Sequence, residues 1–329
     1  MSGRAVALVG PGRMGIAMAV AFAYAGARVD LLDVKPRPDG DAWMGAARRG
    51  VDEHLALLVD CEVLDGDQAG ELAARIRLAG GGDARAALGD AGFIIEAVPE
   101  VLAAKQAAFA VIDACAPADA VVASTTSSFH VDTLARLVSR PERFLNTHWL
   151  NPAYLMPLVE VSPGAATDPA TLEAMLALLR AAGKVPVVVA ASPGYIVPRV
   201  QALAMNEAAR LVEEGVASVE DIDTASRIGF GLRFAVLGLL EFIDWGGADI
   251  LLYGSTYLHE ELEAERYRPP AIVAHHVETD RLGLKSGRGF YDFEQIDVRA
   301  LQADRATRFV KLLRLMDLLP PPAAVPLDC

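Results

Sequence analysis

The feature that most constrains this chain is a glycine-rich loop between an apolar strand and a helix near its start. Residues 5–9 read AVALV, a pattern typical of a buried parallel strand, and run directly into Gly10-Pro-Gly12-Arg-Met-Gly15. An alanine-rich segment, IAMAVAFAYAG, follows with a helical pattern. The three glycines allow a tight turn, the close approach of a diphosphate, and close packing of helix on strand. This order predicts a doubly wound α/β sheet of Rossmann type.

The same region predicts a dinucleotide site. The N–H groups at the start of the helix can bind phosphates. The next strand, ARVDLLD, ends at Asp33, where a carboxylate can accept hydrogen bonds from the adenosine ribose and repel a 2′-phosphate. Asp33 therefore favours NAD over NADP, although Lys35 and Arg37 soften that preference. A doubly wound domain that binds no dinucleotide stays open as the alternative. The residues that we expect to bind NAD here are Gly10, Gly12, Arg13, Met14, Gly15 and Asp33.

The middle of the chain carries a histidine and a carboxylate on two predicted strands. His148 precedes Glu160 by twelve residues, with Asn151-Pro152 as a turn between them. A strand that turns there and returns can bring the two side chains together at the edge of the sheet. A carboxylate that orients an imidazole is the arrangement that proton transfer near neutral pH requires. By itself this spacing also fits a buried, hydrogen-bonded structural histidine.

The remaining pattern predicts two domains. Residues 41–80 are typical of an inserted helical hairpin, and the polar loop 125–128 follows a strand at the end where open α/β sheets bind ligands. We predict a boundary at Ser192-Pro-Gly194. It separates a dinucleotide-binding domain, residues 1–191, from a mostly helical C-terminal domain, residues 192–329. Because the second domain is apolar, we expect it to bury part of its surface in a homodimer.

Charge and cysteine content limit the partners. Thirty Lys and Arg against 43 Asp and Glu give a net charge of -13, which argues against binding nucleic acid or an anionic membrane. No apolar segment approaches the roughly 20 residues that cross a bilayer, and the apolar run at the start is too short for a signal peptide. Cys61, Cys115 and Cys329 are too widely spaced for a metal site or a disulfide framework. We expect a cytoplasmic protein with a small-molecule substrate and no metal.

Together these residues resemble the 3-hydroxyacyl-CoA dehydrogenase family over about residues 5–293. The resemblance implies an NAD-binding domain followed by a helical dimerisation domain. It also implies an oxidoreductase that converts an L-3-hydroxy group to a 3-keto group, reversibly, in fatty acid metabolism. The six matching motifs, in the family's order, are the glycine loop with Asp33, E96-A-V-P-E100 with Lys105, S124-T-T-S-S128, H148-W-L-N-P to Glu160, P193-G-Y-I-V, and G283-L-K-S-G-R-G-F-Y-D.

The resemblance also assigns roles to individual residues. His148 would be the general base or acid, oriented by Glu160. Ser127 would hydrogen-bond the substrate oxygen, and Asn151 would lie beside the nicotinamide and the substrate. The family residues that contact the cofactor match Glu100 and Lys105.

Departures from the family pattern bear on the substrate. Pro198 stands where acyl-CoA members usually carry an Asn that touches the reacting oxygen, and proline offers neither a polar side chain nor an N–H. Several segments are closer to relatives that oxidise small free hydroxy acids, such as carnitine or gulonate dehydrogenases. Arg233 could bind a free carboxylate in a bidentate manner, or it could form a surface ion pair. Coenzyme A would need basic residues near its binding surface, for which the hairpin offers Arg48, Arg49, Arg75 and Arg77.

The sequence therefore leaves three hypotheses. The first is a dehydrogenase of an L-3-hydroxyacyl-CoA, with short chains preferred if the loss of the family Asn and the bulky Trp149 and Tyr154 restrict the pocket. The second is a dehydrogenase of a small free 3-hydroxy acid. The third is an NAD-binding protein with little turnover, because Pro198 replaces the polar Asn of the family.

Overall fold

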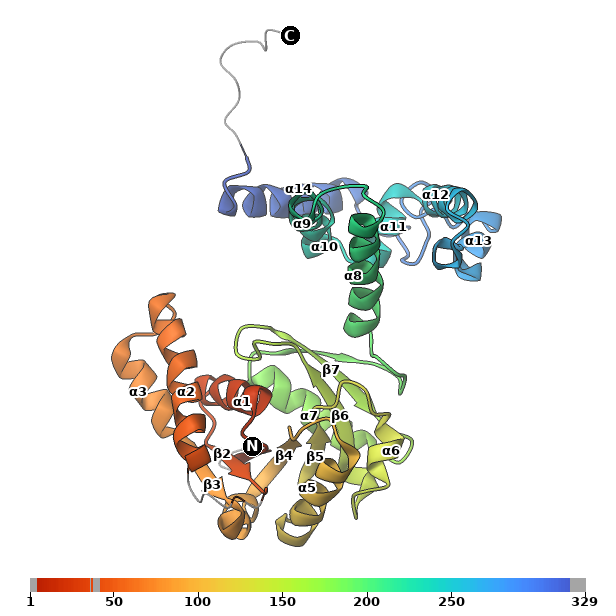
Figure 1. The fold of residues 1–329 in the computed structure, drawn as a ribbon. Coiled ribbons are helices and arrows are strands. Elements are labelled where there is room, and N and C mark those ends of the chain that lie inside the picture. Colours follow the sequence, from red (N-terminus) through yellow and green to blue (C-terminus); the bar gives the residue numbers. More distant parts are fainter. Residues whose placement is uncertain (1–4, 36, 38–41, 320–329) are drawn as a thin grey trace. The chain divides into compact units, whose positions relative to one another are not determined.

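The computed structural model describes residues 5–35, 37 and 42–319 (Figure 1). The chain divides into two compact units, Met1–Ala204 and Met205–Cys329. This division falls within helix α8 (Val197–Glu213). The boundary that we predicted at Ser192 lies in the segment before that helix and stays a prediction.

The first unit is built on one eight-stranded sheet, in the order β3-β2-β1-β4-β5-β6-β7-β8. All neighbouring strands are parallel except β6 and β7, which are antiparallel. The predicted Rossmann-type sheet is confirmed. The strands are β1 (Ala5–Val9), β2 (Val29–Asp33), β3 (Ile76–Gly80), β4 (Ala91–Glu96), β5 (Val121–Ser124), β6 (Phe144–Trp149), β7 (Leu158–Pro163) and β8 (Val185–Val188).

Helices cover both faces of this sheet, so its central strands are apolar on both sides. In β1, Val6 and Leu8 pack in one hydrophobic cluster with α1, α2, α3 and α7, whereas Ala7 and Val9 pack in a second cluster with α4, α5 and α6. The period-two alternation of a strand explains this division. The helices are α1 (Arg13–Tyr24), α2 (Ala42–Asp60), α3 (Gly66–Ala74), α4 (Ala84–Leu88), α5 (Leu102–Cys115), α6 (Val131–Ala135) and α7 (Pro169–Ala181), with 3₁₀ turns at Gly81–Asp83 and Pro141–Arg143.

The segment expected to be a helical hairpin contains both helices and one strand that the pattern did not reveal. Asp65 begins α3 with a capping box: its side chain accepts from Gln68 N, and the Gln68 side chain accepts from Asp65 N. Residues 76–80 of the predicted hairpin instead form β3, which pairs with β2. This strand is an edge strand with a mixed burial pattern, so its sequence, IRLAG, carries little strand signal.

The second unit is helical and has a small core of its own. None of the residues of α8 or α14 is buried, although α8 is 17 residues long. Large apolar side chains are instead exposed, among them Met205 at 64% and Tyr253 at 64%. Its elements are α9 (Val219–Thr224), a π-helical segment (Ala225–Gly231), α10 (Leu232–Val236), α11 (Leu239–Gly246), α12 (Ala248–Glu261), a 3₁₀ turn (Glu265–Tyr267), α13 (Ala271–Glu278) and α14 (Val298–Leu315).

The glycine-rich motif near the end of the chain is anchored by one buried carboxylate. Asp244 of α11 is fully buried, and its side chain accepts hydrogen bonds from Phe290 N at 3.0 Å and Tyr291 N at 2.8 Å. A Cβ on Gly289 would lie 2.0 Å from an Asp244 carboxylate oxygen, so that position requires glycine. Among the described helices, none is both long and apolar enough to span a bilayer.

Candidate active site

The glycine loop between β1 and α1 has the geometry of a phosphate-binding turn. Gly10 has φ 116°, and a Cβ there would lie 2.7 Å from the backbone of Ala97. A Cβ on Gly15 would lie 1.9 Å from Gly10 O, so these two positions permit the close packing of β1, α1 and β4. Gly12, by contrast, faces open space and begins α1 without any side-chain cap. The first N–H groups of α1 are therefore available to an anionic group, which fits the diphosphate of NAD.

Asp33 lies at the carboxyl end of β2, where the ribose of such a cofactor would bind. Its side chain lines a cavity of about 540 Å³ together with Trp43, Met44 and residues 80–83. The two oxygens accept hydrogen bonds from Lys35 N at 2.9 Å and from Arg37 Nε at 2.8 Å. Arg37 therefore neutralises the carboxylate in this structure rather than facing away from it, a pairing that the sequence did not reveal.

His148 and Glu160 are brought together by the antiparallel pairing of β6 and β7. The two residues are direct partners in the strand register, and Nδ1 of His148 lies 2.9 Å from Oε2 of Glu160. The other carboxylate oxygen accepts hydrogen bonds from Ile196 N at 2.7 Å and Val197 N at 3.0 Å. Since a carboxylate can only accept, Nδ1 must carry a hydrogen, and the neutral imidazole then has its lone pair on Nε2. That nitrogen can accept a proton.

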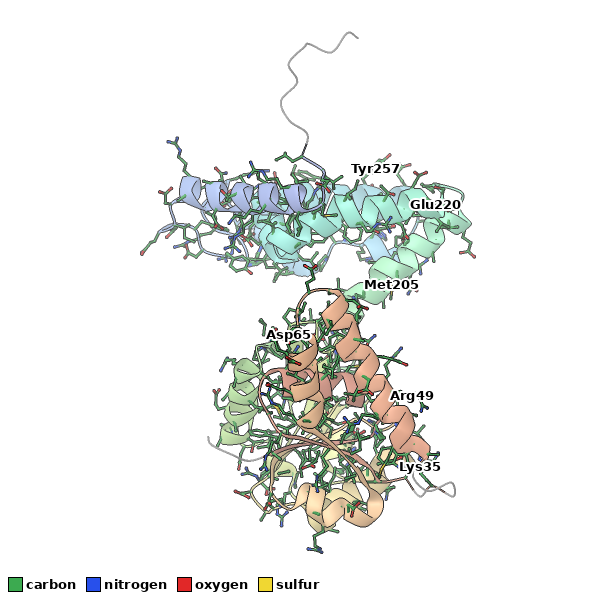
Figure 2. All side chains as sticks on the ribbon, turned by 90° about the vertical axis from the view of Figure 1, so that its left-hand side faces the viewer. Lys35, Arg49, Asp65, Met205, Glu220 and Tyr257 are labelled. Atoms are coloured by element: carbon green, nitrogen blue, oxygen red, sulfur yellow. The ribbon has the colours of Figure 1, made fainter. Side chains whose placement is uncertain are left out.

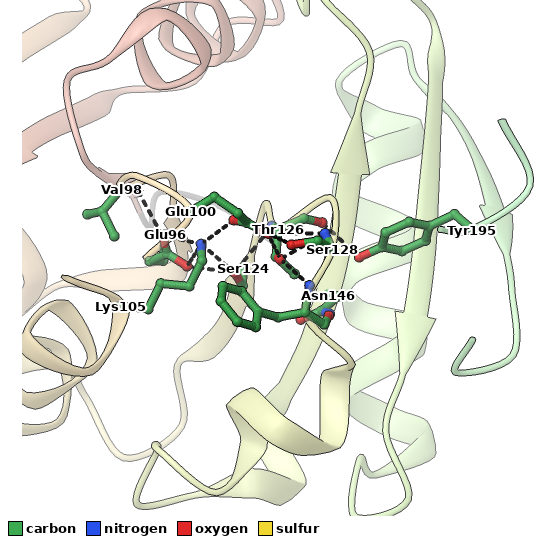
Figure 3. Close-up of polar contacts among 10 residues, drawn as sticks. Glu96, Val98, Glu100, Lys105, Ser124, Thr126, Ser128, Asn146 and Tyr195 are labelled. Atoms are coloured by element: carbon green, nitrogen blue, oxygen red, sulfur yellow. Dashed lines mark hydrogen bonds and ion pairs between the residues drawn. The ribbon is translucent and has the colours of Figure 1, made fainter. Parts of the chain in front are cut away.

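A buried polar cluster links the ends of β4 and β5 (Figure 3). Glu96 and Ser124 are partners in the register of these strands, and Ser124 Oγ donates to Glu96 at 2.6 Å. Lys105 Nζ lies 3.0 Å from Glu96 and 3.2 Å from Glu100. Burial raises the pKa of Glu96, while Lys105 and Ser124 oppose that shift. Glu96 and Ser124 belong to two of the matching motifs but received no role from the sequence, although a carboxylate and a hydroxyl that end neighbouring strands could have indicated one.

The two residues expected to contact the cofactor from this cluster differ in exposure. The Lys105 side chain is only 1% exposed, enclosed by its two carboxylate partners, whereas the Glu100 side chain is 38% exposed. Glu100 accepts hydrogen bonds from Thr126 Oγ1 and from Ser128 Oγ and N. These bonds outweigh partial burial and hold the Glu100 pKa below its ordinary value. Lys105 and Glu100 thus fix the loop 125–128, and only Glu100 reaches the surface.

Ser127 and Asn151 lie at the carboxyl ends of β5 and β6, two parallel neighbours. Both residues are exposed. Ser127 lies between Thr126 and Ser128, whose side chains bind Glu100. Ser127, Asn151 and His148 therefore all lie at the carboxyl ends of the strands. This is where open α/β sheets bind their ligands.

Trp149 does not lie on the face of β6 that carries His148, so it does not contribute to the condition set for short chains. Strand alternation directs Trp149 to the face opposite His148, where it is buried and packs edge-to-face on Phe22 of α1 with ring centroids 5.6 Å apart. Lys184 Nζ lies 6.0 Å from its ring centroid and donates to Ala153 O and Met156 O. Tyr154 contacts the ring of His54 of α2 at 4.8 Å. Trp149 and Lys184 therefore support the loop that carries Asn151.

Pro198 and Arg233 lie on the helices α8 and α10. Pro198 occupies the first turn of α8, where proline is tolerated because that N–H has no helical partner. Arg233 lies on α10 of the second unit, exposed, with its guanidinium 5.7 Å from the ring centroid of Phe242. Among the described residues, no group of three or more His, Cys, Asp or Glu side chains is arranged to hold a metal ion.

Comparison with known proteins agrees with this geometry. The model of the NAD binding domain of 3-hydroxyacyl-CoA dehydrogenase matches residues 5–192, and that of the C-terminal domain of 3-hydroxyacyl-CoA dehydrogenase matches residues 194–293. The chain is 34% identical over 321 residues to 5-formyl-3-hydroxy-2-methylpyridine 4-carboxylate 5-dehydrogenase of Mesorhizobium japonicum, covering 95% of this chain and 98% of that one. It is 35% identical over 288 residues to 3-hydroxybutyryl-CoA dehydrogenase of Bradyrhizobium diazoefficiens, covering 88% and 94%. A solved 3-hydroxyacyl-CoA dehydrogenase of Archaeoglobus fulgidus superimposes with a TM-score of 0.75 at 29% identity, over 96% and 100% of the two chains.

Proposed function

Because this chain belongs to the 3-hydroxyacyl-CoA dehydrogenase family, and is thus an NAD-dependent oxidoreductase acting on CH–OH groups, we propose that it interconverts a small free 3-hydroxy acid and the corresponding 3-keto acid. The sequence alone favours a CoA thioester as the substrate, because the family is dominated by such substrates. The contacts of the helical hairpin support our choice of the free acid.

Proton transfer is assigned to His148. NAD, when bound, accepts the hydride from the carbon that carries the hydroxyl group. The Nε2 lone pair of His148 takes the hydroxyl proton, and the carbonyl forms as the hydride leaves. Glu160 keeps Nδ1 protonated through the 2.9 Å contact and balances the charge of the imidazolium that results. In the reverse direction the same imidazolium returns its proton to the oxygen of the keto group.

The other site residues complete this arrangement. Ser127 donates a hydrogen bond to the substrate oxygen from the loop that Glu100 and Lys105 hold in shape. Asn151 would lie beside the nicotinamide and the substrate, and Gly10, Gly12, Arg13, Met14 and Gly15 would hold the diphosphate. Asp33 binds the adenosine ribose, with Arg37 as its partner.

The single observation that carries the choice of substrate is the charge of the hairpin α2–α3. Coenzyme A is a polyanion and needs basic partners at the protein surface. Three of the four arginines in this region are engaged within the fold: Arg48 with Ala73 O and Ile76 O, Arg75 with Ala23 O, and Arg77 with Asp30 and Ala86 O. From residue 51 to residue 74 there is no Lys or Arg, while Asp and Glu recur throughout.

Figure 2 labels Arg49 on α2, just before this segment, and Asp65 within it, at the turn before α3. Among the described residues of α2 and α3, Arg49 is exposed and is the one arginine not engaged by a backbone carbonyl or a carboxylate of the fold. The carboxylates around it would repel the phosphate groups of coenzyme A. A substrate with one carboxylate avoids this repulsion. The Mesorhizobium japonicum relative, whose name gives a free pyridine carboxylate as its substrate, supports the same choice.

Arg233 is our candidate partner for that carboxylate. Its guanidinium is exposed beside the ring of Phe242, and among the described residues no carboxylate forms an ion pair with it. The CoA thioester is kept as the second candidate, because the Bradyrhizobium diazoefficiens relative is named a 3-hydroxybutyryl-CoA dehydrogenase. A role in fatty acid metabolism belongs to that second candidate.

We propose that the active form is a homodimer formed through the second unit. Residues 205–213 of α8, none of them buried, together with the exposed Met205 and Tyr253, leave apolar surface that a second copy of the chain can cover. This proposal matches the weak core of the second unit, which few side chains fill.

The experiment follows NADH oxidation with free acetoacetate and, in parallel, acetoacetyl-CoA, with His148→Gln as the control. We expect turnover of the free acid, or of a related small keto acid, at least tenfold faster than that of the thioester. In the variant, kcat should fall by a factor of about 10² to 10⁴, while the affinity for NADH should not change. Turnover of the thioester alone would overturn the substrate proposal. Equal rates for wild type and variant would overturn the role of His148.

A further inference from the structure

One short turn, Pro193–Val197, controls two sides of the His148 imidazole. Gly194 has φ 78° and Tyr195 has φ 47°, so two consecutive residues adopt the left-handed conformation. Glycine adopts it readily, but a bulky aromatic residue rarely does, and such a conformation persists only where surrounding contacts require it. The contacts of the Tyr195 side chain therefore hold the backbone of this turn in its left-handed conformation.

The Tyr195 ring lies flat on His148. The two ring centroids are 4.8 Å apart and the planes differ by 17°. Tyr195 is only 7% exposed, so its ring and the imidazole cover each other from solvent. A stacked aromatic ring prevents the imidazole from rotating out of its plane.

The Tyr195 hydroxyl connects this stack to the loop after β5. It donates a hydrogen bond to Thr126 O at 2.9 Å. Figure 3 shows the hydroxyl directed from its turn toward Thr126, Ser128 and Asn146. Burial raises the pKa of Tyr195 well above its ordinary value, so the hydroxyl keeps its proton and remains a donor.

The next two residues of the turn hold the carboxylate partner of His148. Ile196 N and Val197 N both donate to Oε1 of Glu160, while Oε2 faces His148. The face of the imidazole and its Nδ1 edge are thus both determined by residues 195–197, and Nε2 is left for the substrate.

We infer that Tyr195 is a positioning residue, whose ring fixes the plane of His148 and whose hydroxyl ties that plane to the loop that carries Ser127. The inference rests on the proposed function in one respect, that His148 transfers the proton. The distance and direction between Nε2 and the Ser127 hydroxyl then depend on Tyr195, although Tyr195 does not contact the reacting atoms. A side chain that only filled space would affect stability and leave the orientation of His148 unchanged.

The test compares Tyr195→Phe and Tyr195→Leu with a control variant, Phe109→Leu. The control also removes a buried aromatic ring, which packs on Phe144 in the hydrophobic cluster beneath α4, α5 and α6. The first measurement is the NMR spectrum of the enzyme with ¹³C-labelled histidine, with the His148 signals identified by their loss in His148→Gln. A ring stacked on the imidazole moves these signals upfield. We expect the upfield shift in wild type, Tyr195→Phe and Phe109→Leu, and its loss in Tyr195→Leu.

This first measurement needs no substrate, so it separates the inference from the proposed function. If wild type reduces none of the keto acids, the proposed function fails, and the spectra still decide whether the stack exists. Unshifted His148 signals in wild type, or equal signals in wild type and Tyr195→Leu, would overturn the inference. Should Tyr195→Leu not fold, the wild-type shift and the Phe variant still test it.

The second measurement is kinetic. With a substrate that wild type turns over, Tyr195→Leu should lose on the order of 10- to 100-fold in kcat, while the dissociation constant of NADH stays within about twofold, because the effect is one of misorientation. Tyr195→Phe keeps the ring but loses the hydrogen bond to Thr126 O, so its kcat should lie between those of wild type and Tyr195→Leu. Phe109→Leu should leave kcat unchanged. A wild-type kcat in Tyr195→Leu would overturn the positioning role.

Discussion

His148 and Glu160 face each other across the antiparallel pair β6–β7, with Nδ1 of the histidine 2.9 Å from Oε2 of the glutamate. The carboxylate is itself fixed by two backbone N–H groups, those of Ile196 and Val197. Three donors thus converge on one acceptor group, and the imidazole between Glu160 and Tyr195 keeps a single free nitrogen.

The tautomer of His148 provides the first prediction. In Glu160→Gln, the amide oxygen can still accept from Ile196 and Val197, but the amide NH₂ then faces Nδ1. Nδ1 must accept, so the hydrogen moves to Nε2 and blocks proton abstraction. We expect kcat to fall by about 10² to 10⁴, with the ¹⁵N spectrum of His148 changed to the other tautomer. Glu173→Gln, an exposed position of α7, is the control, and an unchanged tautomer in Glu160→Gln would contradict this account.

Stability in acid tests the contacts of Glu207 in the second unit. Its pKa is about 2, below the ordinary 4.5, first because Arg266 donates to it and then because Tyr267 and Arg210 do. A depressed pKa means that the ionised form stabilises the fold above about pH 4.5, and that this stability is lost as the pH falls toward 2. Glu207→Gln should therefore lower Tm at neutral pH, and the difference from wild type should shrink through that window. Glu214→Gln is the control; a constant difference across the window would exclude the linkage.

Lys184 should stabilise the loop that carries Asn151. The ammonium donates to Ala153 O at 2.6 Å and to Met156 O at 3.0 Å. Lys184→Met keeps the apolar stem but leaves these carbonyl groups without their donor, which should lower the free energy of unfolding by about 1–3 kcal/mol in urea denaturation. Lys311→Met, an exposed position of α14, should change it by less than about 0.5 kcal/mol. Equal effects of the two variants would show that Lys184 does not support the loop.

The apolar surface of the second unit predicts the mass of the particle in solution. Light scattering on the purified protein at micromolar concentration should give twice the 34.9 kDa mass of the chain. Met205→Glu, at a side chain that is 64% exposed, adds a charge to this surface and should shift the equilibrium toward the monomer if a partner covers it. A clean monomer mass for wild type would remove the homodimer from the proposal.

The sequence predicted the fold of the first unit well because the motifs that specify it are short and contiguous. The strand Ala5–Val9, the loop from Gly10 to Gly15 and the following helix are specified by contiguous residues, and the close approach at Gly10 and Gly15 permits nothing larger. The turn at Asn151-Pro152 between two apolar runs likewise predicted that His148 and Glu160 would meet. The edge strand Ile76–Gly80 was missed because its pattern is mixed, and only the packing on Phe22 shows that Trp149 lies away from His148.

The sequence by itself determined the fold, the family and the residue types that can do the chemistry, because each is encoded in short motifs whose order along the chain is preserved. The tertiary structure decided which of those residues are free to act. In the sequence, Arg48, Arg75 and Arg77 could all belong to an exposed basic surface. Their hydrogen-bond partners come from distant strands and helices that only folding brings near. The stack of Tyr195 on His148 arises in the same way, since 47 positions separate the two residues and only the backbone turn at Gly194 brings their rings together.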